Sequence, residues 1–250
     1  LPLGNPSAGI QNVKKADYIG KDLYSERLDL TKAFNKKFSS EFPQKRVRAY
    51  TDLYDDAIKL MQSKDLEAFD LTKESQEMRD AYGDNNFGQG CLLARRLVEN
   101  NVRFIEVVLG GWDMHNDVFG SLETKGSTLD QGLSMLLKDL DSRGLLSETM
   151  VVVASEFGRT PEVKPGRIGR DHHPSSFSAL LAGGGIKSGF VHGKSDERAH
   201  YIEEGGVGME DLNATIAFAM GLDTRKITYS PSGRPFKVAH DGKIIREILS

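Results

Sequence analysis

The chain has 250 residues, of which 38% are hydrophobic and 28% are charged, and its formal net charge is −3. This size and composition suit one sizeable α/β domain, or one domain with an appendage. The weakly acidic balance gives no sign of a nucleic-acid-binding surface. The single cysteine, Cys91, excludes an intramolecular disulfide and a thiolate zinc site. No apolar run reaches the roughly 20 residues of a membrane span, so we expect none.

Residues 1–84 are expected to form a helical and loop-like flank. Residues 1–20 are punctuated by Gly, Pro and Asn, whereas residues 21–80 are charge-rich and mostly helix-forming. Leu53, Ala57 and Leu60 have the spacing of one helix face. The sequence does not start with Met, so we expect a fragment or a processed product.

Residues 85–250 are expected to form an α/β domain that is one compact unit with the flank. Helical spacing of apolar residues predicts helices near 85–100 and 127–143. Runs of β-branched residues predict strands near 102–109, 149–155 and 177–182. Strands that alternate with helices predict right-handed crossovers and therefore a mostly parallel sheet flanked by helices.

Polar side chains that can bind a metal follow the ends of these predicted strands. Asp113 and His115 come after the first strand, Glu156 follows the second, and His172 lies in the next polar segment. Carboxylate and imidazole ligands suit zinc, manganese or iron. Two residues apart in an extended loop, Asp113 and His115 can reach one ion. The alternative is a loop aspartate that caps its own turn beside a solvated histidine.

Two arginines lie in the same stretch. Arg159 and Arg170 could bind a phosphate or sulfate group through their forked guanidinium groups. They could equally pair with Glu156, Asp171 or Asp113, and the sequence leaves both interpretations open.

The hydroxyls nearest to these residues do not form a recognisable nucleophile. Ser155 lies in Ala154-Ser155-Glu156, which is not the G-x-S-x-G turn of a serine hydrolase. Thr160 precedes Pro161 in a loop and has no evident base beside it except the histidines. The catalytic nucleophile therefore stays unknown.

A set of motifs in this order resembles the DUF1501 family of bacterial proteins, which is placed within the alkaline phosphatase/sulfatase-like superfamily. The motifs are Ala68-Phe69-Asp70-Leu71, Phe87-Gly88-Gln89-Gly90-Cys91-Leu92-Leu93-Ala94-Arg95-Arg96-Leu97, Gly111-Trp112-Asp113-Met114-His115, Ser155-Glu156-Phe157-Gly158-Arg159-Thr160-Pro161, Gly169-Arg170-Asp171-His172 and Ala182-Gly183-Gly184-Gly185.

The resemblance implies a fold, a chemistry and a set of ligands. Members of the superfamily have a mostly parallel sheet between helices, typically bind two divalent metals and hydrolyse phosphate or sulfate esters. By position, Asp113 and His115 resemble the D-x-x-x-H element, Glu156 the Asp of the D-H element, and His172 the later His. The resemblance thus implies a divalent metal cofactor such as zinc or manganese, a small-molecule or glycan ester as partner, and a periplasmic or secreted location.

The chain also departs from the superfamily pattern. The D-x-x-x-H spacing is shortened to D-x-H, and Phe157 stands where the D-H histidine would be. The N-terminal strand with the first Asp and the nucleophile has no match, so that part of the superfamily core is expected to be missing. We therefore expect an incomplete, weakly active metal-dependent hydrolase. The alternatives are a non-catalytic binding or scaffold protein that kept the fold and, less favoured, a structural carbohydrate-binding or cell-surface protein.

Overall fold

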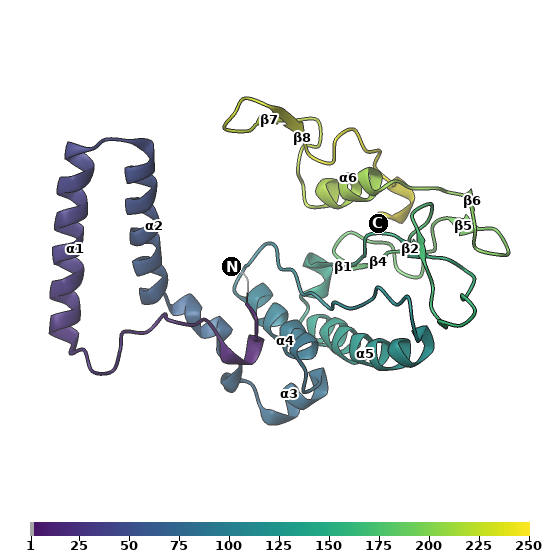
Figure 1. Ribbon diagram of the computed structural model, residues 1–250, viewed down its shortest axis with the longest axis horizontal. Helices are drawn as coiled ribbons and strands as arrows, with labels where there is room; N and C mark the ends of the chain where they lie inside the picture. Colours follow the sequence, from purple (N-terminus) through teal and green to yellow (C-terminus); the bar gives the residue numbers. More distant parts are fainter. Residues whose placement is uncertain (1–2) are drawn as a thin grey trace. The chain divides into compact units, whose positions relative to one another are not determined.

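The computed structural model describes residues 3–250 and divides the chain into two compact units, Leu1–Val107 and Val108–Ser250 (Figure 1). The expected boundary between residues 84 and 85 falls inside unit 1. None of the helices formed by residues 3–250 combines the length and the apolar character needed to cross a lipid bilayer.

The regular elements of unit 1 are all helices among its described residues. Its elements are η1 (Pro6–Ala8), α1 (Lys21–Glu41), α2 (Lys45–Gln62), η2 (Lys64–Phe69), η3 (Leu71–Lys73), α3 (Gln76–Tyr82) and α4 (Asn86–Glu99). Helices α1 and α2 form an antiparallel hairpin (Figure 1).

Helix α4 carries most of the core of unit 1. It begins where the Asn85 side chain accepts a hydrogen bond from the Gly88 backbone N–H at 2.9 Å, a typical N-cap interaction. The side chains of Cys91, Leu92 and Leu93 on α4 are buried, and so is Tyr82 at the end of α3. Burial raises the pKa of the Cys91 thiol to about 12, so this thiol stays protonated and packs as a small apolar group.

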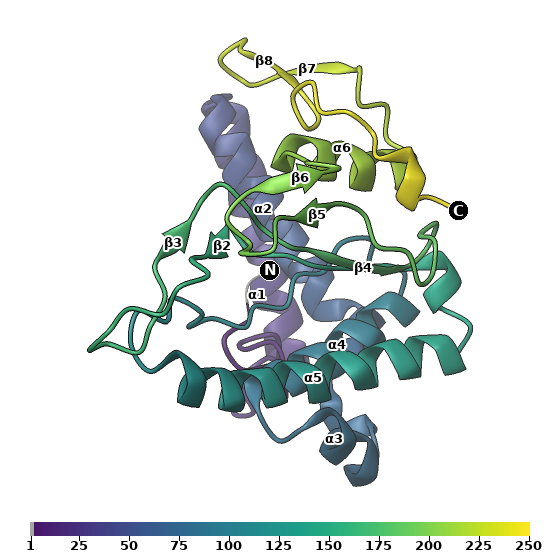
Figure 2. The same ribbon diagram turned by 90° about the vertical axis from the view of Figure 1, so that its right-hand side faces the viewer.

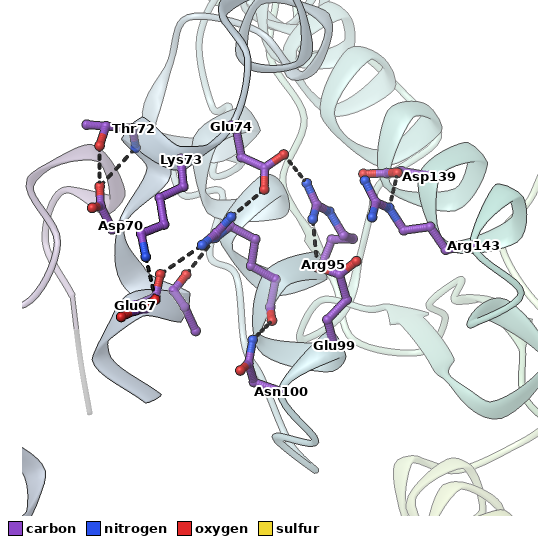
Figure 3. A network of polar contacts seen from close by, with 12 residues as sticks. Glu67, Asp70, Thr72, Lys73, Glu74, Arg95, Glu99, Asn100, Asp139 and Arg143 are labelled. Carbon is purple, nitrogen blue, oxygen red and sulfur yellow. Dashed lines mark hydrogen bonds and ion pairs between the residues drawn. The ribbon is translucent and has the colours of Figure 1, made fainter. Parts of the chain in front are cut away.

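A network of ion pairs fastens the segment before α3 to α4 (Figure 3). The Glu74 carboxylate pairs with Arg95, at 2.7 Å, and with Arg96. Arg96 also donates to the backbone carbonyls of Ala68 and Glu67, both at 2.8 Å. Burial raises the pKa of Glu74, but the hydrogen bonds from Arg95 and Arg96 outweigh it and hold the pKa below its usual value.

Unit 2 combines two long helices with short strands (Figure 2). Its elements are α5 (Val118–Ser142), η4 (Leu146–Glu148), β1 (Met150–Val153), β2 (Gly158–Arg159), β3 (His172–His173), β4 (Leu180–Gly183), β5 (Lys194–Ser195), β6 (Ile202–Glu204), α6 (Met209–Ala219), β7 (Ile227–Tyr229), β8 (Pro235–Lys237) and η5 (Arg246–Ile248).

The C-terminal tail is held to α6 by side-chain hydrogen bonds. The Asp211 carboxylate caps the helix by accepting from Gly208 N–H at 3.1 Å, and it also accepts from Lys243 N–H at 2.6 Å. The Thr215 hydroxyl, which is fully buried, accepts from Ile245 N–H at 2.9 Å. These bonds satisfy backbone donors that the irregular tail cannot pair within a sheet.

The predicted fold class, a mostly parallel sheet flanked by helices, is wrong. The structure is 46% helical, and its strands form only short two-stranded antiparallel sheets. Strand β1 pairs antiparallel with β4, with Val152 opposite Leu181. A parallel pair needs a crossover, usually a helix, but the chain between β1 and β4 holds only the short strands β2 and β3. The chain therefore returns beside β1 in the opposite direction.

Several predicted elements are nevertheless present. The helix near 85–100 is confirmed as α4, and the helix near 127–143 is confirmed within α5, which begins earlier, at Val118. Strands near 149–155 and 177–182 correspond to β1 and β4. The strand near 102–109 is not formed: these residues have no ladder partner among residues 3–250, and Phe104 and Val108 are exposed.

Candidate metal site

A short β-hairpin presents two of the predicted site residues. Strands β2 and β3 pair antiparallel (Figure 2), and their register places Arg159 opposite His172. Thr160 extends the pairing, since its N–H donates to the Asp171 carbonyl at 2.9 Å and its hydroxyl accepts from Asp171 N–H at 3.1 Å. The hairpin therefore fixes the positions of residues 159 and 172 relative to each other.

The loop that carries Asp113 and His115 packs directly against the segment before β3. The Met114 carbonyl accepts from Arg170 N–H at 3.1 Å, and the Met114 side chain is buried. A Cβ atom on Gly169 would lie 1.9 Å from the His115 carbonyl oxygen, so only glycine allows the two backbones to approach this closely. This contact brings the loop within reach of the hairpin.

Three possible metal ligands meet where the loop and the hairpin touch. Asp113 Oδ1 lies 3.0 Å from His115 Nε2 and 3.0 Å from His172 Nε2, and the two Nε2 atoms are 3.2 Å apart. Among residues 3–250, these three form the group of His, Cys, Asp and Glu side chains that could hold an ion. All three side chains are partly exposed, at 60%, 32% and 48% for Asp113, His115 and His172, so the site is open to solvent.

The spacing of these atoms fits a transition-metal ion. A tetrahedral zinc ion with ligand bonds of about 2.0–2.1 Å separates neighbouring ligand atoms by roughly 3.3 Å. The observed separations of 3.0–3.2 Å are close to that value. One carboxylate oxygen and two imidazole nitrogens also match the ligand preference of zinc, and they leave a fourth position open.

A second carboxylate orients His115. Asp171 Oδ1 lies 3.2 Å from His115 Nδ1, on the side of the ring that faces away from the ligand group. An imidazole that donates Nδ1–H to a carboxylate keeps the lone pair of Nε2 free for a metal. The hydrogen bond from Lys164, and to a smaller degree that from His115, hold the pKa of Asp171 below its usual value of 3.8. Asp171 therefore stays an acceptor.

Arg159 links Asp113 to Glu156. Its guanidinium group pairs with Asp113 through Nη1 and with Glu156 Oε1 through Nη2, the latter at 3.1 Å. Hydrogen bonds from His172 and from Arg159 lower the pKa of Asp113. Of the predicted metal ligands, Asp113, His115 and His172 are thus brought together. Glu156 is outside this group, and its role as a ligand stays a prediction.

Arg170 and Thr160 are both engaged with the backbone. Arg170 Nη1 donates to the carbonyls of Thr160 and Pro161, each at 2.7 Å, and so closes the loop after β2. The Thr160 hydroxyl donates to the Glu162 carbonyl at 3.2 Å. Substrate binding by Arg170 stays a prediction, and these bonds give both side chains a structural role.

The neighbours of His172 separate it from the adjacent histidine. The Phe157 ring packs on His172 with centroids 4.8 Å apart. His173 faces elsewhere, with its Nε2 2.9 Å from the His200 carbonyl. The two adjacent histidines therefore have different surroundings, and only His172 joins the ligand group.

The sequence indicated Asp171 only as a possible partner of Arg159 and Arg170, and it indicated no role for Lys164. The only signal in the sequence that placed Asp171 at the site was its position directly before His172.

Comparison with known proteins gives one family. No curated protein and no solved structure is similar enough to be matched. The family described as "Protein of unknown function (DUF1501)" matches residues 1–249, which is almost the whole chain. The chain therefore belongs to the DUF1501 family.

Proposed function

We propose that Asp113, His115 and His172 bind one divalent metal ion, zinc or manganese, and that the site acts on phosphate or sulfate esters. The observation that carries the proposal is the meeting of three ligand atoms within 3.0–3.2 Å of one another. Their order along the chain resembles that of the metal ligands in the alkaline phosphatase/sulfatase-like superfamily. This support comes from the residues of the site and does not depend on a parallel sheet.

The residues around the site suit an anionic ester. A bound divalent ion would polarise the ester oxygen and stabilise the charge that develops during hydrolysis. Arg159 places a guanidinium group beside Asp113, where it can also neutralise an anionic oxygen of the ester. Asp171 holds the His115 ring in one orientation and one tautomer. The side chains are thus prearranged for binding and charge stabilisation.

A second candidate is a metal-dependent binding protein without turnover. The observation in its favour is that the Thr160 hydroxyl is held between the Asp171 N–H and the Glu162 carbonyl, so it is not poised to attack an ester. Covalent catalysis needs an activated nucleophile next to a base. We therefore expect hydrolysis by this chain to be slow.

The test is hydrolysis of aryl phosphate and aryl sulfate by the full chain, with and without added zinc or manganese. We expect slow turnover that requires the metal, is lost in Asp113→Asn and is kept in the matched control Glu162→Gln, whose carboxylate pairs with His200 instead. Tight metal binding with no turnover would favour the binding protein, and absence of metal binding would reject both candidates.

We also propose a periplasmic or secreted location, which rests only on the resemblance to the superfamily. Fractionation of cells that carry the intact gene would test it. Recovery of the protein from the cytoplasmic fraction alone would reject it.

A further inference from the structure

The α1–α2 hairpin exposes an apolar surface along its whole length. On α1, Leu30, Phe34 and Phe38 are four residues apart and form one row, and their exposed fractions are 55%, 63% and 53%. On α2, Tyr50 and Leu53 are 66% and 69% exposed. Contiguous exposed apolar side chains of this kind mark an interaction surface.

The contact between α1 and α2 leaves most of this surface exposed. Tyr24, Leu28 and Asn35 lie on the half-buried row of α1, and the Tyr24 hydroxyl lies 3.8 Å from Met61 Sδ of α2. No residue of α1 is buried, and Ile58 is the buried residue of α2. The more apolar row of α1 therefore lies beside the contact with α2 and stays largely exposed. The hairpin alone thus lacks much of the burial that stabilises helices in water.

Charge is divided between the two ends of the hairpin. The half near the loop, residues 32–51, has six basic residues and one acidic residue, a net charge of +5. The opposite half, residues 21–31 and 52–62, has three basic and six acidic residues, a net charge of −3. Among residues 3–250, no ion pair joins α1 to α2, and the pair between Lys59 and Asp56, at 3.2 Å, lies within α2 with both side chains exposed to solvent. The charges of the two helices are therefore accessible to a partner.

We propose that this surface binds the same hairpin of a second copy of the chain, with the two hairpins antiparallel. A two-fold axis near the middle of the helices places the basic half of each copy against the acidic half of the other. Lys37 on α1 then faces Glu26 of the second copy, and Arg46 on α2 faces its Asp56. The exposed apolar rows are covered along their length, as in a four-helix bundle.

An anionic membrane surface fits the observations less well. The basic half would be attracted to such a surface, but the acidic half would be repelled. The apolar side chains extend into the acidic half, where Leu23 and Leu60 are also exposed. A second copy is complementary to both halves, whereas a membrane is complementary to one.

The test uses two matched charge-reversal variants of the full chain. One variant, Lys37→Glu with Arg46→Glu, reverses charge in the basic half, and the other, Glu26→Lys with Asp56→Lys, reverses it in the acidic half. All four side chains are exposed. Sedimentation velocity should show a dimer for the wild type, monomers for each variant alone, and a restored dimer when the two variants are mixed in equal amounts.

Mass spectrometry of the wild type gives a second readout that needs no substitution. After mixing isotope-labelled and unlabelled chains, an amine-to-carboxyl cross-linker should join Lys37 of one copy to Glu26 of the other. A monomeric wild type, a mixture of variants that stays monomeric, or cross-links between the basic halves of two copies would each overturn the proposal. So would a monomer that binds anionic phosphatidylserine vesicles.

Discussion

His115 Nδ1 lies 3.2 Å from Asp171 Oδ1, although the two residues are 56 positions apart in the sequence. The contact orients an imidazole whose other nitrogen faces Asp113 and His172. Carboxylate, histidine and metal follow one another in this way in many zinc proteins, where the outer carboxylate fixes the ring. The relationship makes Asp171 a positioning residue of the candidate site.

Asp171→Asn should weaken metal binding without preventing it. The amide can donate to Nδ1 and so favour the tautomer with its proton on Nε2, the nitrogen that must bind the metal. We expect zinc affinity to fall about 10–100-fold, the usual effect of losing an outer-shell partner. Isothermal titration calorimetry measures it, and Glu162→Gln is the control. Unchanged affinity in Asp171→Asn would show that Asp171 does not position the ligand.

Gly169→Ala should separate the loop from the hairpin. Its Cβ would lie 1.9 Å from the His115 carbonyl oxygen, so one of the two backbones must move. We expect loss of metal binding, with a change in the His115 ring signals in NMR spectra. Gly126→Ala in α5 is the control, because nothing lies within 4 Å of its Cβ, and alanine there should stabilise the helix by up to about 1 kcal/mol. Equal metal affinity in both variants would contradict the proposed packing.

The stability of unit 1 should depend on pH through Glu74. The pKa of Glu74 in the folded chain is below the usual value of 4.5. Its contribution to the free energy of unfolding is therefore complete above pH 4.5 and is lost as the pH falls through the folded pKa. Glu74→Gln should therefore lower the free energy of unfolding by about 3 kcal/mol at neutral pH, because it removes the carboxylate that pairs with both the buried Arg95 and Arg96.

Urea unfolding followed by circular dichroism measures this difference. The difference in the free energy of unfolding between the wild type and Glu74→Gln should become smaller at pH values below 4.5. Lys73→Ala, which removes an exposed ion pair with Glu67, should change little at either pH. If this difference in the free energy of unfolding stays constant with pH, the Glu74 carboxylate is not the source of the pH dependence.

The sequence predicted local structure better than the way in which the elements combine. Helix α4 could be predicted because Cys91, Ala94 and Val98 follow helical spacing after the Asn85 cap. The direction of strand pairing could not, because it depends on whether a helix separates β1 from β4. Apolar runs are shared by strands of both kinds, and Phe104 shows that such a run can also stay unpaired and exposed.

The candidate site could likewise be predicted from the sequence only in part. Asp113 and His115 follow from the spacing of two ligand types in one loop, and His172 from the order of motifs along the chain. The position of Glu156 depends on Arg159, whose pairing the sequence left open between a substrate and several carboxylates. The role of Asp171 depends on a contact with His115, which is 56 positions away, and local sequence patterns do not reveal such a contact.

The central claim is that one divalent metal binds to Asp113, His115 and His172. The most direct measurement is zinc titration of the metal-free chain by calorimetry, for the wild type and for two adjacent histidine variants. We predict one tight site per chain in the wild type and in His173→Ala, whose ring faces the His200 carbonyl, and loss of that site in His172→Ala. Equal zinc binding by both variants, or none by the wild type, would contradict the account.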